Sequence, residues 1–188
     1  MPEVIVELRN PTEQGRLYYE RDPEIEGHIV YIQTPMRRRI IHSVIINGGQ
    51  AILEFDADRI LLDVEFISNW NAWRKLPVLE VPRVSRIADL ALSNLEPDPE
   101  RPPSTKIDRD GFLRHYCSFD TVAMKTTDAN RSCVQFLFGT TEPVGEWIAL
   151  SHQCFALVAD NFLRGFFVQL ANAPLRQYKT RQTQRAAG

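Results

Sequence analysis

The chain has 188 residues, of which 44% are apolar and 24% charged, and its formal net charge at pH 7 is −2. A chain of this length can bury a core without disulfides or metal, and its charge excludes a global field that would attract nucleic acid or a membrane surface. No apolar run approaches the roughly 18 residues needed to span a bilayer, and the N-terminus lacks the pattern of a signal peptide. We therefore expect a cytosolic protein.

Alternating apolar residues in the first third of the chain predict short β-strands. The expected strands are residues 4–8, 16–20, 28–32, 43–46, 51–55 and 60–67. Polar residues separate them, and Asn47-Gly48-Gly49 is a strong hairpin turn signal. This order predicts a meander of six strands.

A helix and a linker are predicted next. In residues 85–95, Ser85 can cap a helix whose apolar stripe consists of Ile87, Leu90, Ala91 and Leu95, so we expect a short amphipathic helix that covers the sheet. Residues 96–111 carry four prolines and few apolar residues, which is typical of a proline-rich crossover between two units.

The second half again predicts strands. They are expected at residues 112–119, 122–125, 132–138 and 146–150, followed by a hairpin over 154–170. The end of the chain, residues 174–188, contains Arg176, Lys179, Arg181 and Arg185 and no acidic residue, so we interpret it as a basic tail.

An internal repeat organises these elements. Residues 53–67 and 155–169 both read as apolar strand, acidic turn and apolar strand, with turns expected at Asp58-Arg59 and Asp160-Asn161. We predict an α+β, mainly β protein with two tandem, related antiparallel half-sheets. The expected divisions are 1–95, the linker 96–111, 112–173 and the basic tail 174–188.

One stretch resembles a known group of proteins. It runs from Leu17-Tyr18-Tyr19 through Asp22 and Tyr31 to residues 53–58 and 64–67. This stretch is similar to a small family of uncharacterised bacterial β-rich domains, over residues 15–67 and more weakly over 112–170. The resemblance implies a tyrosine-bearing strand, an acidic turn and a terminal hairpin that ends in an apolar-Glu-apolar triplet. It implies no activity and no catalytic residue.

The first hairpin should have one apolar and one acidic face. A two-residue turn at Asp58-Arg59 would pair Ala57 with Ile60, Phe55 with Leu62 and Leu53 with Val64. The opposite face then collects four carboxylates, which we predict to point to solvent and to bind a partner: Glu54, Asp56, Asp63 and Glu65. Opposed Glu54 and Asp63 repel each other, which is tolerated where the face is well solvated or meets a basic surface. A plain solvated face and a divalent-metal or acid–base site remain as alternatives.

Aromatic and apolar residues suggest two further contacts. Trp70 and Trp73 either seal the junction between sheet and helix or anchor a partner, because tryptophan is enriched at binding hot spots. In the second hairpin, the face expected to carry Val158, Leu163 and Phe167 is too apolar to be left in water. We expect the helix, the other half or a second copy of the chain to cover it.

The cysteines give little support for catalysis or metal binding. Cys117, Cys133 and Cys154 should be unpaired and buried. The pairs His115/Cys117 and His152/Cys154 each share a strand face, which leaves a small hydrolase or metal-dependent enzyme as an alternative function. Because neither an orienting acid nor a fourth zinc ligand accompanies them, we assign no catalytic residue, metal or cofactor.

The function that these patterns favour is binding. Arg37-Arg38-Arg39 lacks interleaved aromatic residues, so we interpret it as a solvated loop and predict neither a nucleic-acid nor a membrane partner. We predict a non-enzymatic, cytosolic protein-binding module, immunity- or antitoxin-like, that blocks a basic partner with its acidic hairpin face. A structural or self-assembling, phage-type component is a third hypothesis.

Overall fold

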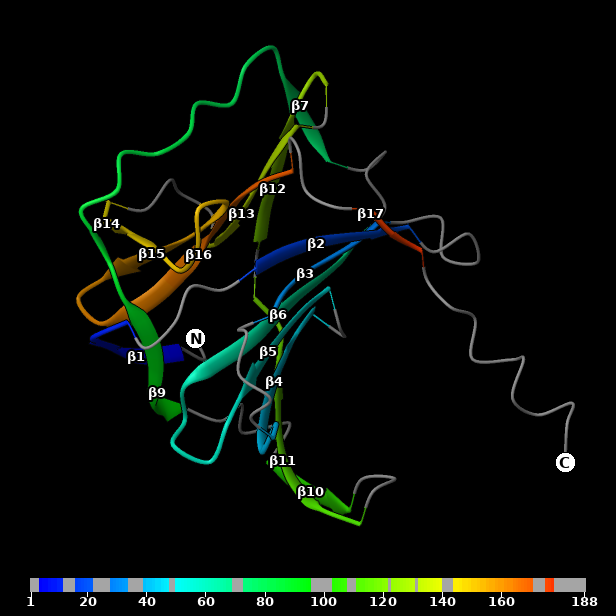
Figure 1. Cartoon of the computed structure of the whole chain (residues 1–188), viewed down its shortest axis with the longest axis vertical. Helices are drawn as coiled ribbons and strands as arrows, with labels where there is room; N and C mark the ends of the chain where they lie inside the picture. Colours follow the sequence, from blue (N-terminus) through cyan, green and yellow to red (C-terminus); the bar gives the residue numbers. More distant parts are fainter. Residues whose placement is uncertain are drawn as a thin grey trace, which may run out of the picture.

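The protein consists of two β-sheets that pack face to face (Figure 1). The computed structural model describes residues 4–11, 16–21, 28–33, 39–47, 50–68, 73–95, 103–107, 111–121, 123–130, 132–139, 144–170 and 175–177. Within these ranges every regular element is a strand, which confirms the mainly β prediction. No helix formed by the described residues is long and apolar enough to cross a membrane.

The first sheet has eight strands among the described residues. Neighbouring strands in it are antiparallel except in two pairs. In spatial order they are β10 (Ser104–Ile107), β11 (Leu113–Phe119), β4 (His42–Ile46), β5 (Ala51–Phe55), β6 (Leu61–Ser68), β3 (His28–Gln33), β2 (Arg16–Arg21) and β17 (Leu175–Gln177). The two parallel pairings are those of β11 with β4 and of β17 with β2.

The second sheet has nine strands in the same described ranges. Its main path is β7 (Arg74–Leu76), β12 (Ala123–Asp128), β13 (Cys133–Phe138), β16 (Phe162–Gln169), β15 (Cys154–Ala159), β14 (Glu146–Ala149) and β8 (Arg86–Ile87). Off this path, β1 (Val4–Arg9) pairs with β16 and with β9 (Asp89–Leu95).

The central five strands of the two sheets have the same order. In the eight-stranded sheet it is β4-β5-β6-β3-β2, and in the nine-stranded sheet it is β14-β15-β16-β13-β12, with every neighbouring pair antiparallel. A parallel strand flanks each end of each unit: β11 and β17 in one sheet, β8 and β7 in the other. Each half of the sequence therefore contributes strands to both sheets.

One hydrophobic core lies between the sheets. Phe66 of the eight-stranded sheet contacts Phe136 and Phe166 of the nine-stranded sheet, with ring centroids 5.5 Å apart in both cases. Leu53 and Val64 are fully buried beside them. Successive side chains of a strand point to opposite faces, so the residues between these face outward. Burying each such ring contributes about 2 to 3 kcal/mol, and this shared core holds the two sheets together.

The predicted helix over residues 85–95 is wrong. This stretch forms β8 and β9, and β9 pairs with β1. Ala88, Leu90 and Leu92 are each at most 5% exposed and lie in the core. The apolar residues of this stretch contain one set with a period of two and another with a period of 3.6, and the pairing of β9 with β1 selects the first.

The predicted linker 96–111 is also partly wrong. Residues 104–107 form β10, an exposed edge strand that pairs with β11. Residues 96–102 and 108–110 lie outside the described residues. A strand of only four residues with no buried side chain carries little apolar signal, so the prolines around it dominated the pattern.

The two predicted hairpins are present, but their turns differ. Asp160 and Asn161 both have positive φ, at 51° and 66°, and form the two-residue turn expected between β15 and β16. The turn between β5 and β6 spans residues 56–60 instead of Asp58-Arg59 alone, because the amide of Arg59 donates to the carbonyl of Asp56 and the amide of Asp56 to that of Ile60. Arg59 takes the left-handed conformation, with φ 62°.

Residues 77–85 cover the outer face of the nine-stranded sheet. They run from β7 at one edge to β8 at the other, and Leu79 packs against a cluster on this face that includes Phe155, Phe167 and Trp147. The apolar second hairpin is thus covered by a segment from the first half of the chain. Val158 and Leu163, expected on the same face as Phe167, lie instead in the main core, since Arg164 is an extra residue in the ladder and Gly165 restarts it.

Candidate functional site

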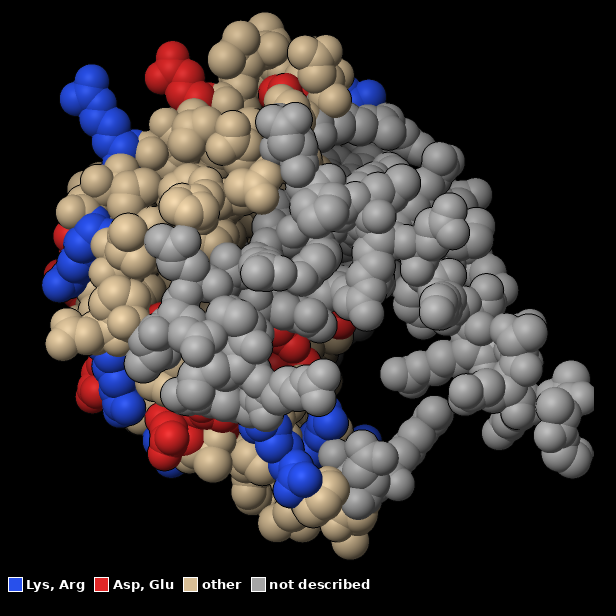
Figure 2. All heavy atoms as spheres, in the orientation of Figure 1, with Lys and Arg blue, Asp and Glu red and all other residues tan. Residues whose placement is uncertain are grey.

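Three carboxylates gather on the outer face of the eight-stranded sheet. Glu54 of β5 lies directly opposite Asp63 of β6, as predicted, and Glu65 follows Asp63 on the same face. All three side chains are half-buried. In Figure 2, red carboxylate atoms lie close to blue basic atoms in the lower centre of the view, where β10 and β11 lie in Figure 1.

The acids on this face repel one another. Burial, followed by the charges of Glu54 and Glu65, raises the pKa of Asp63 to about 7. Burial also raises the pKa of Glu54, although Arg114 opposes the shift with a guanidinium 4.0 Å from its carboxylate. Glu54 is therefore the member of the pair that has a cationic partner, and near neutral pH Asp63 carries a proton about half of the time.

A buried hydroxyl lies beside this pair. Ser43 of β4 stands opposite Glu54 in the ladder, so Ser43, Glu54 and Asp63 form one row across three strands. Ser43 is 2% exposed, and its Oγ makes no hydrogen bond of normal geometry, although its proximity to Glu54 works to lower the pKa of that carboxyl. The row thus combines a buried hydroxyl with excess negative charge.

Asp56 does not belong to the acidic face. We expected it to point to solvent, but it is 4% exposed, and its Oδ1 accepts a hydrogen bond of 2.8 Å from the amide of Ile60. Asp56 closes the turn, and a structural carboxylate of this kind is satisfied locally. Sequence alternation failed here because the turn begins at Asp56, two residues earlier than expected.

The two tryptophans do not form a described binding surface. Trp73 is 5% exposed and packs in the core against Phe136, with ring centroids 6.5 Å apart, so its ring is not available to a partner. Trp70 lies outside the described residues. The interpretation of Trp73 as a sealing residue is closer to what is observed, although strands rather than a helix surround it.

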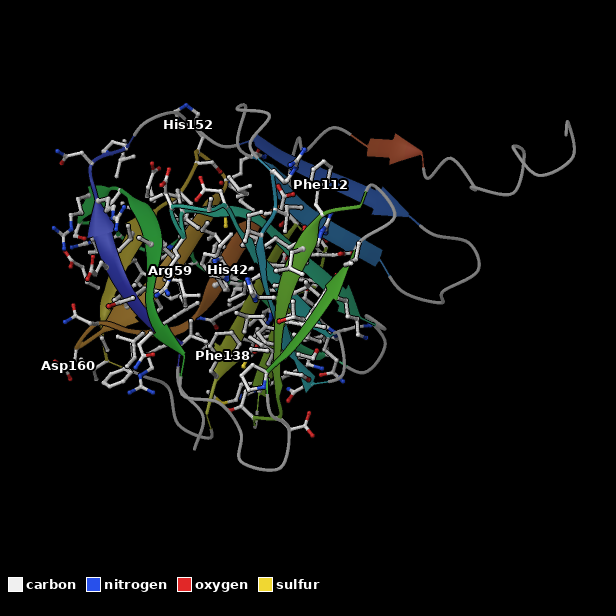
Figure 3. The ribbon with its side chains drawn as sticks, turned by 90° about the horizontal axis from the view of Figure 1, so that it is seen from below. His42, Arg59, Phe112, Phe138, His152 and Asp160 are labelled. Atoms are coloured by element: carbon white, nitrogen blue, oxygen red, sulfur yellow. The ribbon has the colours of Figure 1, made fainter. Side chains whose placement is uncertain are left out.

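The His/Cys pairs do not form reactive centres. Cys154 is fully buried, and burial raises the pKa of its thiol, while His152 is exposed at the periphery, well away from His42 in Figure 3. Cys117 is buried, and the ring of the exposed His115 stacks on the ring of His42 instead. All three cysteines are buried and none forms a disulfide, which confirms that prediction.

Sequence reasoning missed a pair of stacked histidines. His42 of β4 and His115 of β11 lie on neighbouring parallel strands with ring centroids 5.2 Å apart, and Thr105 Oγ1 is 3.2 Å from His115 Nδ1. Burial, followed by the charges of His115 and Arg59, lowers the pKa of His42. His42 and His115 are brought together by the parallel pairing of β4 with β11, and no local sequence pattern predicts that pairing.

The carboxylate row has a defined chemical capability. Among the described residues no group of three His, Cys, Asp or Glu side chains is arranged to hold a metal ion. A carboxylate that titrates near neutral pH can exchange its proton for a cationic group, because ammonium and guanidinium groups both neutralise charge and donate hydrogen bonds. The row is therefore suited to a lysine or arginine side chain.

The sequence matches no protein-family model, and no curated protein is significantly similar to it.

Proposed function

We propose that this chain is a non-enzymatic, cytosolic protein-binding module that takes a basic segment of a partner on Glu54, Asp63 and Glu65. The observation that carries the proposal is the opposition of Glu54 and Asp63 on a half-buried sheet face. Within the described part of the chain, the ion pair of Glu54 with Arg114 is the cationic contact found for these two acids. A cation from a partner would relieve the remaining repulsion.

The energetics favour binding over a purely structural role. Opposed like charges on a sheet destabilise by up to about 1 kcal/mol, and the burial of Asp63 adds to that cost. A protein that needed only a stable sheet would carry neutral residues there, as the equivalent hairpin of the other sheet does with Phe155 and Phe167. Immunity proteins and antitoxins that block basic partners are the class with which this surface chemistry agrees best.

We further propose that the two five-stranded units arose by internal duplication. Identical strand order, identical pairing and parallel flanking strands in both sheets support it. The resemblance of residues 15–67 and 112–170 to a bacterial β-rich domain family belongs to the same proposal. It predicts that relatives with a single unit exist and assemble as pairs, because each unit borrows flanking strands from the other. A single-unit relative that is a stable monomer would contradict it.

The binding function is tested with a lysine- and arginine-rich peptide as the probe. In isothermal titration calorimetry, Glu54→Gln with Asp63→Asn should weaken peptide binding about tenfold and flatten its dependence on salt, as loss of close charge contacts does. The control is Glu7→Gln with Glu80→Gln, which removes the same charge from exposed positions elsewhere. Equal affinities of the two double variants would refute the acidic face as the binding surface.

A further inference from the structure

Residues 77–88, the crossing segment, turn every third residue toward the sheet that they cross. The segment leaves β7, crosses the outer face of the nine-stranded sheet and ends just after β8 (Figure 1), and residues 78–85 form neither helix nor strand. Leu79 and Pro82 are half-buried, and Leu79 packs on the aromatic cluster of that face. Three positions further, Ser85 is hydrogen-bonded to the sheet, and Ala88 is 4% exposed.

A second set of every third residue forms an exposed aliphatic stripe. Its members are 70%, 46%, 38% and 51% exposed, in chain order: Val78, Val81, Val84 and Ile87. They are half of the eight large apolar side chains that are exposed in the described part of the chain. Single exposed apolar residues are normal on a protein surface, whereas a regular row of them marks an interaction surface. The row therefore calls for a partner.

The third set of residues makes the surroundings of this stripe positive. It consists of Pro77, Glu80, Arg83 and Arg86, all of which are exposed. Residues 74 and 75 of β7, an arginine and a lysine, are exposed just before them. Residues 74–88 thus hold four cationic side chains and one carboxylate, and only part of this charge is offset by the ion pair of Arg86 with Glu146, at 3.4 Å.

The period of three is that of the polyproline II helix. This left-handed helix has three residues per turn and no internal hydrogen bonds, so it presents three separate rows of side chains. Pro77 and Pro82 fix φ at about −65°, the value that such a helix needs, and keep the residues before them extended. The crossing segment therefore gives one row to the sheet and leaves an aliphatic row and a charged row exposed.

The sheet holds this segment in place along its whole length. At one end β7 pairs with β12, and in the middle Leu79 packs on the outer cluster. At the other end the amide and the hydroxyl of Ser85 both donate to the carbonyl of Trp147, at 3.1 Å, and the amide of Ala88 donates to the carbonyl of Ala149, at 3.2 Å. A partner would therefore bind an extended segment that is already ordered, and would not meet the entropy cost of ordering it.

We propose that the crossing segment is a docking surface for a partner protein domain that has an aromatic-lined groove with an acidic rim. The groove takes the aliphatic stripe 78, 81, 84 and 87, and the rim takes the guanidinium of Arg83. Grooves of this kind recognise polyproline II segments through two of their three rows, and here the third row is the one that the sheet occupies. Aromatic rings suit both aliphatic side chains and guanidinium groups. This surface is separate from the acidic face of the other sheet and adds a second partner to the proposed function.

Charge and area both favour such a domain over a second copy of the chain. A two-fold contact would place the same patch of each copy together, so the excess positive charge of residues 74–88 would meet itself. Four aliphatic side chains also supply only a part of the roughly 800 Å² that each partner buries in a stable dimer. A groove that wraps around the segment gains contacts with the charged row as well, and an acidic rim turns the same charge into attraction.

The experiment titrates the isotope-labelled full-length chain with purified SH3 and WW domains that carry acidic residues beside their grooves, followed by NMR. We expect binding by at least one domain of the set, with amide shifts concentrated in residues 77–88. Val81→Ser with Val84→Ser should weaken this binding about tenfold, and both side chains are exposed, so the fold is retained. Val144→Ser is the matched control, because this valine is 94% exposed elsewhere on the surface. The proposal is overturned if no domain of the set binds, or if the control loses as much affinity as the double variant.

Two charge variants of the same exposed row test the acidic rim. Arg83→Gln should weaken domain binding about threefold and reduce its dependence on salt, as loss of a charge contact does. Glu80→Gln removes the opposite charge from the same row and should leave the affinity unchanged or raise it up to about twofold. Weakening by Glu80→Gln with no effect of Arg83→Gln would overturn the rim and the partner chemistry built on it.

Further measurements separate this partner from other occupants and from the acidic face. Sedimentation should show no self-association that depends on Val81 and Val84; if it does, the stripe binds a second copy. Vesicles of phosphatidylcholine and phosphatidylglycerol should not bind through these two valines; if they do, the stripe meets a lipid surface. Either result overturns the proposal. Glu54→Gln with Asp63→Asn should leave domain binding unchanged while it weakens binding of the basic peptide, so each of the two surfaces can fail without the other.

Discussion

The hairpins β5–β6 and β15–β16 hold the same place in their sheets but present opposite chemistry to the outside. Both bury their inner faces in the shared core, through Leu53 and Phe66 in one and Ala156 and Phe166 in the other. Their outer faces differ: one opposes Glu54 to Asp63, and the other opposes Phe155 to Phe167. The need to build one core constrains the inner faces alone, so the outer faces are where the two units have been free to acquire different roles.

The two hairpins also differ in how they accommodate a break in strand register. Each contains one extra residue that breaks the register: Leu62, opposite the junction of Glu54 and Phe55, in the first, and Arg164, opposite the junction of Leu157 and Val158, in the second. The second ladder restarts at Gly165, with φ 154°, and its turn holds the left-handed residues Asp160 and Asn161, whereas the first hairpin has its left-handed residue at Arg59. The second hairpin therefore depends on a glycine within the sheet, and the first holds an arginine in a conformation that favours glycine.

The largest effect is expected from Gly165→Ala. A Cβ at this position would lie 2.4 Å from the carbonyl oxygen of Phe136 and 2.9 Å from Cα of Leu137, both backbone atoms that cannot move aside cheaply. The substitution should destabilise the protein by about 3 kcal/mol or more, measured as the free energy of unfolding in urea. Gly139→Ala is the control, since its φ is also positive but nothing lies within 4 Å of its Cβ, and about 1 kcal/mol is expected. Similar losses at both sites would contradict the close approach at Gly165.

The next effect in size concerns the acidic face. Asp63 has a pKa raised to about 7, whereas the unfolded chain has a carboxyl of ordinary pKa, so the folded state holds a proton that the unfolded state has lost. This cost is absent below pH 4, grows between about pH 4 and pH 7 and is complete above. Asp63→Asn removes it and should stabilise the protein by roughly 2 kcal/mol at pH 8, less than the full shift implies because solvent screens a half-exposed group.

The pH profile of that gain is the decisive readout. Urea unfolding of both chains should give nearly equal stabilities at pH 4 and the full difference at pH 8. A gain that is independent of pH would mean that Asp63 is not the titrating group on this face.

The sequence predicted what local patterning controls and failed where distant pairing decides. Alternation located the main strands of both units, the turn at Asp160-Asn161 and the opposition of Glu54 to Asp63, because each of these depends on residues close together in the chain. It assigned a helix to residues 85–95, since Leu90 and Leu92 take their strand character from β1, more than eighty positions away.

The same limit applies to the candidate site. The carboxylates of one hairpin were found from their spacing, but the roles of Ser43, Arg114 and His115 depend on β4 and β11 lying beside that hairpin. The pairing of β7 and β17 with the edges of the other unit could not be predicted from the sequence either. Each of these strands is three residues long, which is too short to show a period of two. Short edge strands are specified by the sheet that they join rather than by their own sequence.

A smaller effect tests how the aromatic outer face is kept from water. Leu79→Ala removes the half-buried side chain that packs on Phe155 and Phe167 and should cost about 1 to 2 kcal/mol. The exposed cluster should then bind a hydrophobic dye and promote self-association, measured by fluorescence and by sedimentation. Val78→Ala is the matched control. Val78 is the neighbour of Leu79 in the chain and is 70% exposed, so little change is expected. Equal effects of the two changes would show that residues 77–85 do not act as the cover.

The smallest effect is expected at the tip of the first hairpin. Arg59 holds φ 62°, a conformation that costs a residue with a Cβ about 1 kcal/mol relative to glycine. Part of the gain from Arg59→Gly is offset by the greater freedom of glycine in the unfolded chain, so a net stabilisation of about 0.5 kcal/mol is expected. Arg59→Lys is the control, because it retains the strained backbone and loses the hydrogen bond from Nη1 to the carbonyl of Ser93, 3.2 Å long.

Arg59→Gly should also change the pKa of His42, which relief of backbone strain alone would not do. The charge of Arg59 helps to lower the pKa of His42, so its removal should raise that pKa, whereas Arg59→Lys should leave it nearly unchanged. Titration of the His42 ring by NMR measures the shift. A stabilised glycine variant with an unshifted His42 would confirm the relief of backbone strain but contradict the proximity of the guanidinium to the stacked histidines. A destabilised glycine variant would show instead that the hydrogen bond from the Arg59 guanidinium to the carbonyl of Ser93 stabilises the hairpin against β9 by more than the backbone strain costs.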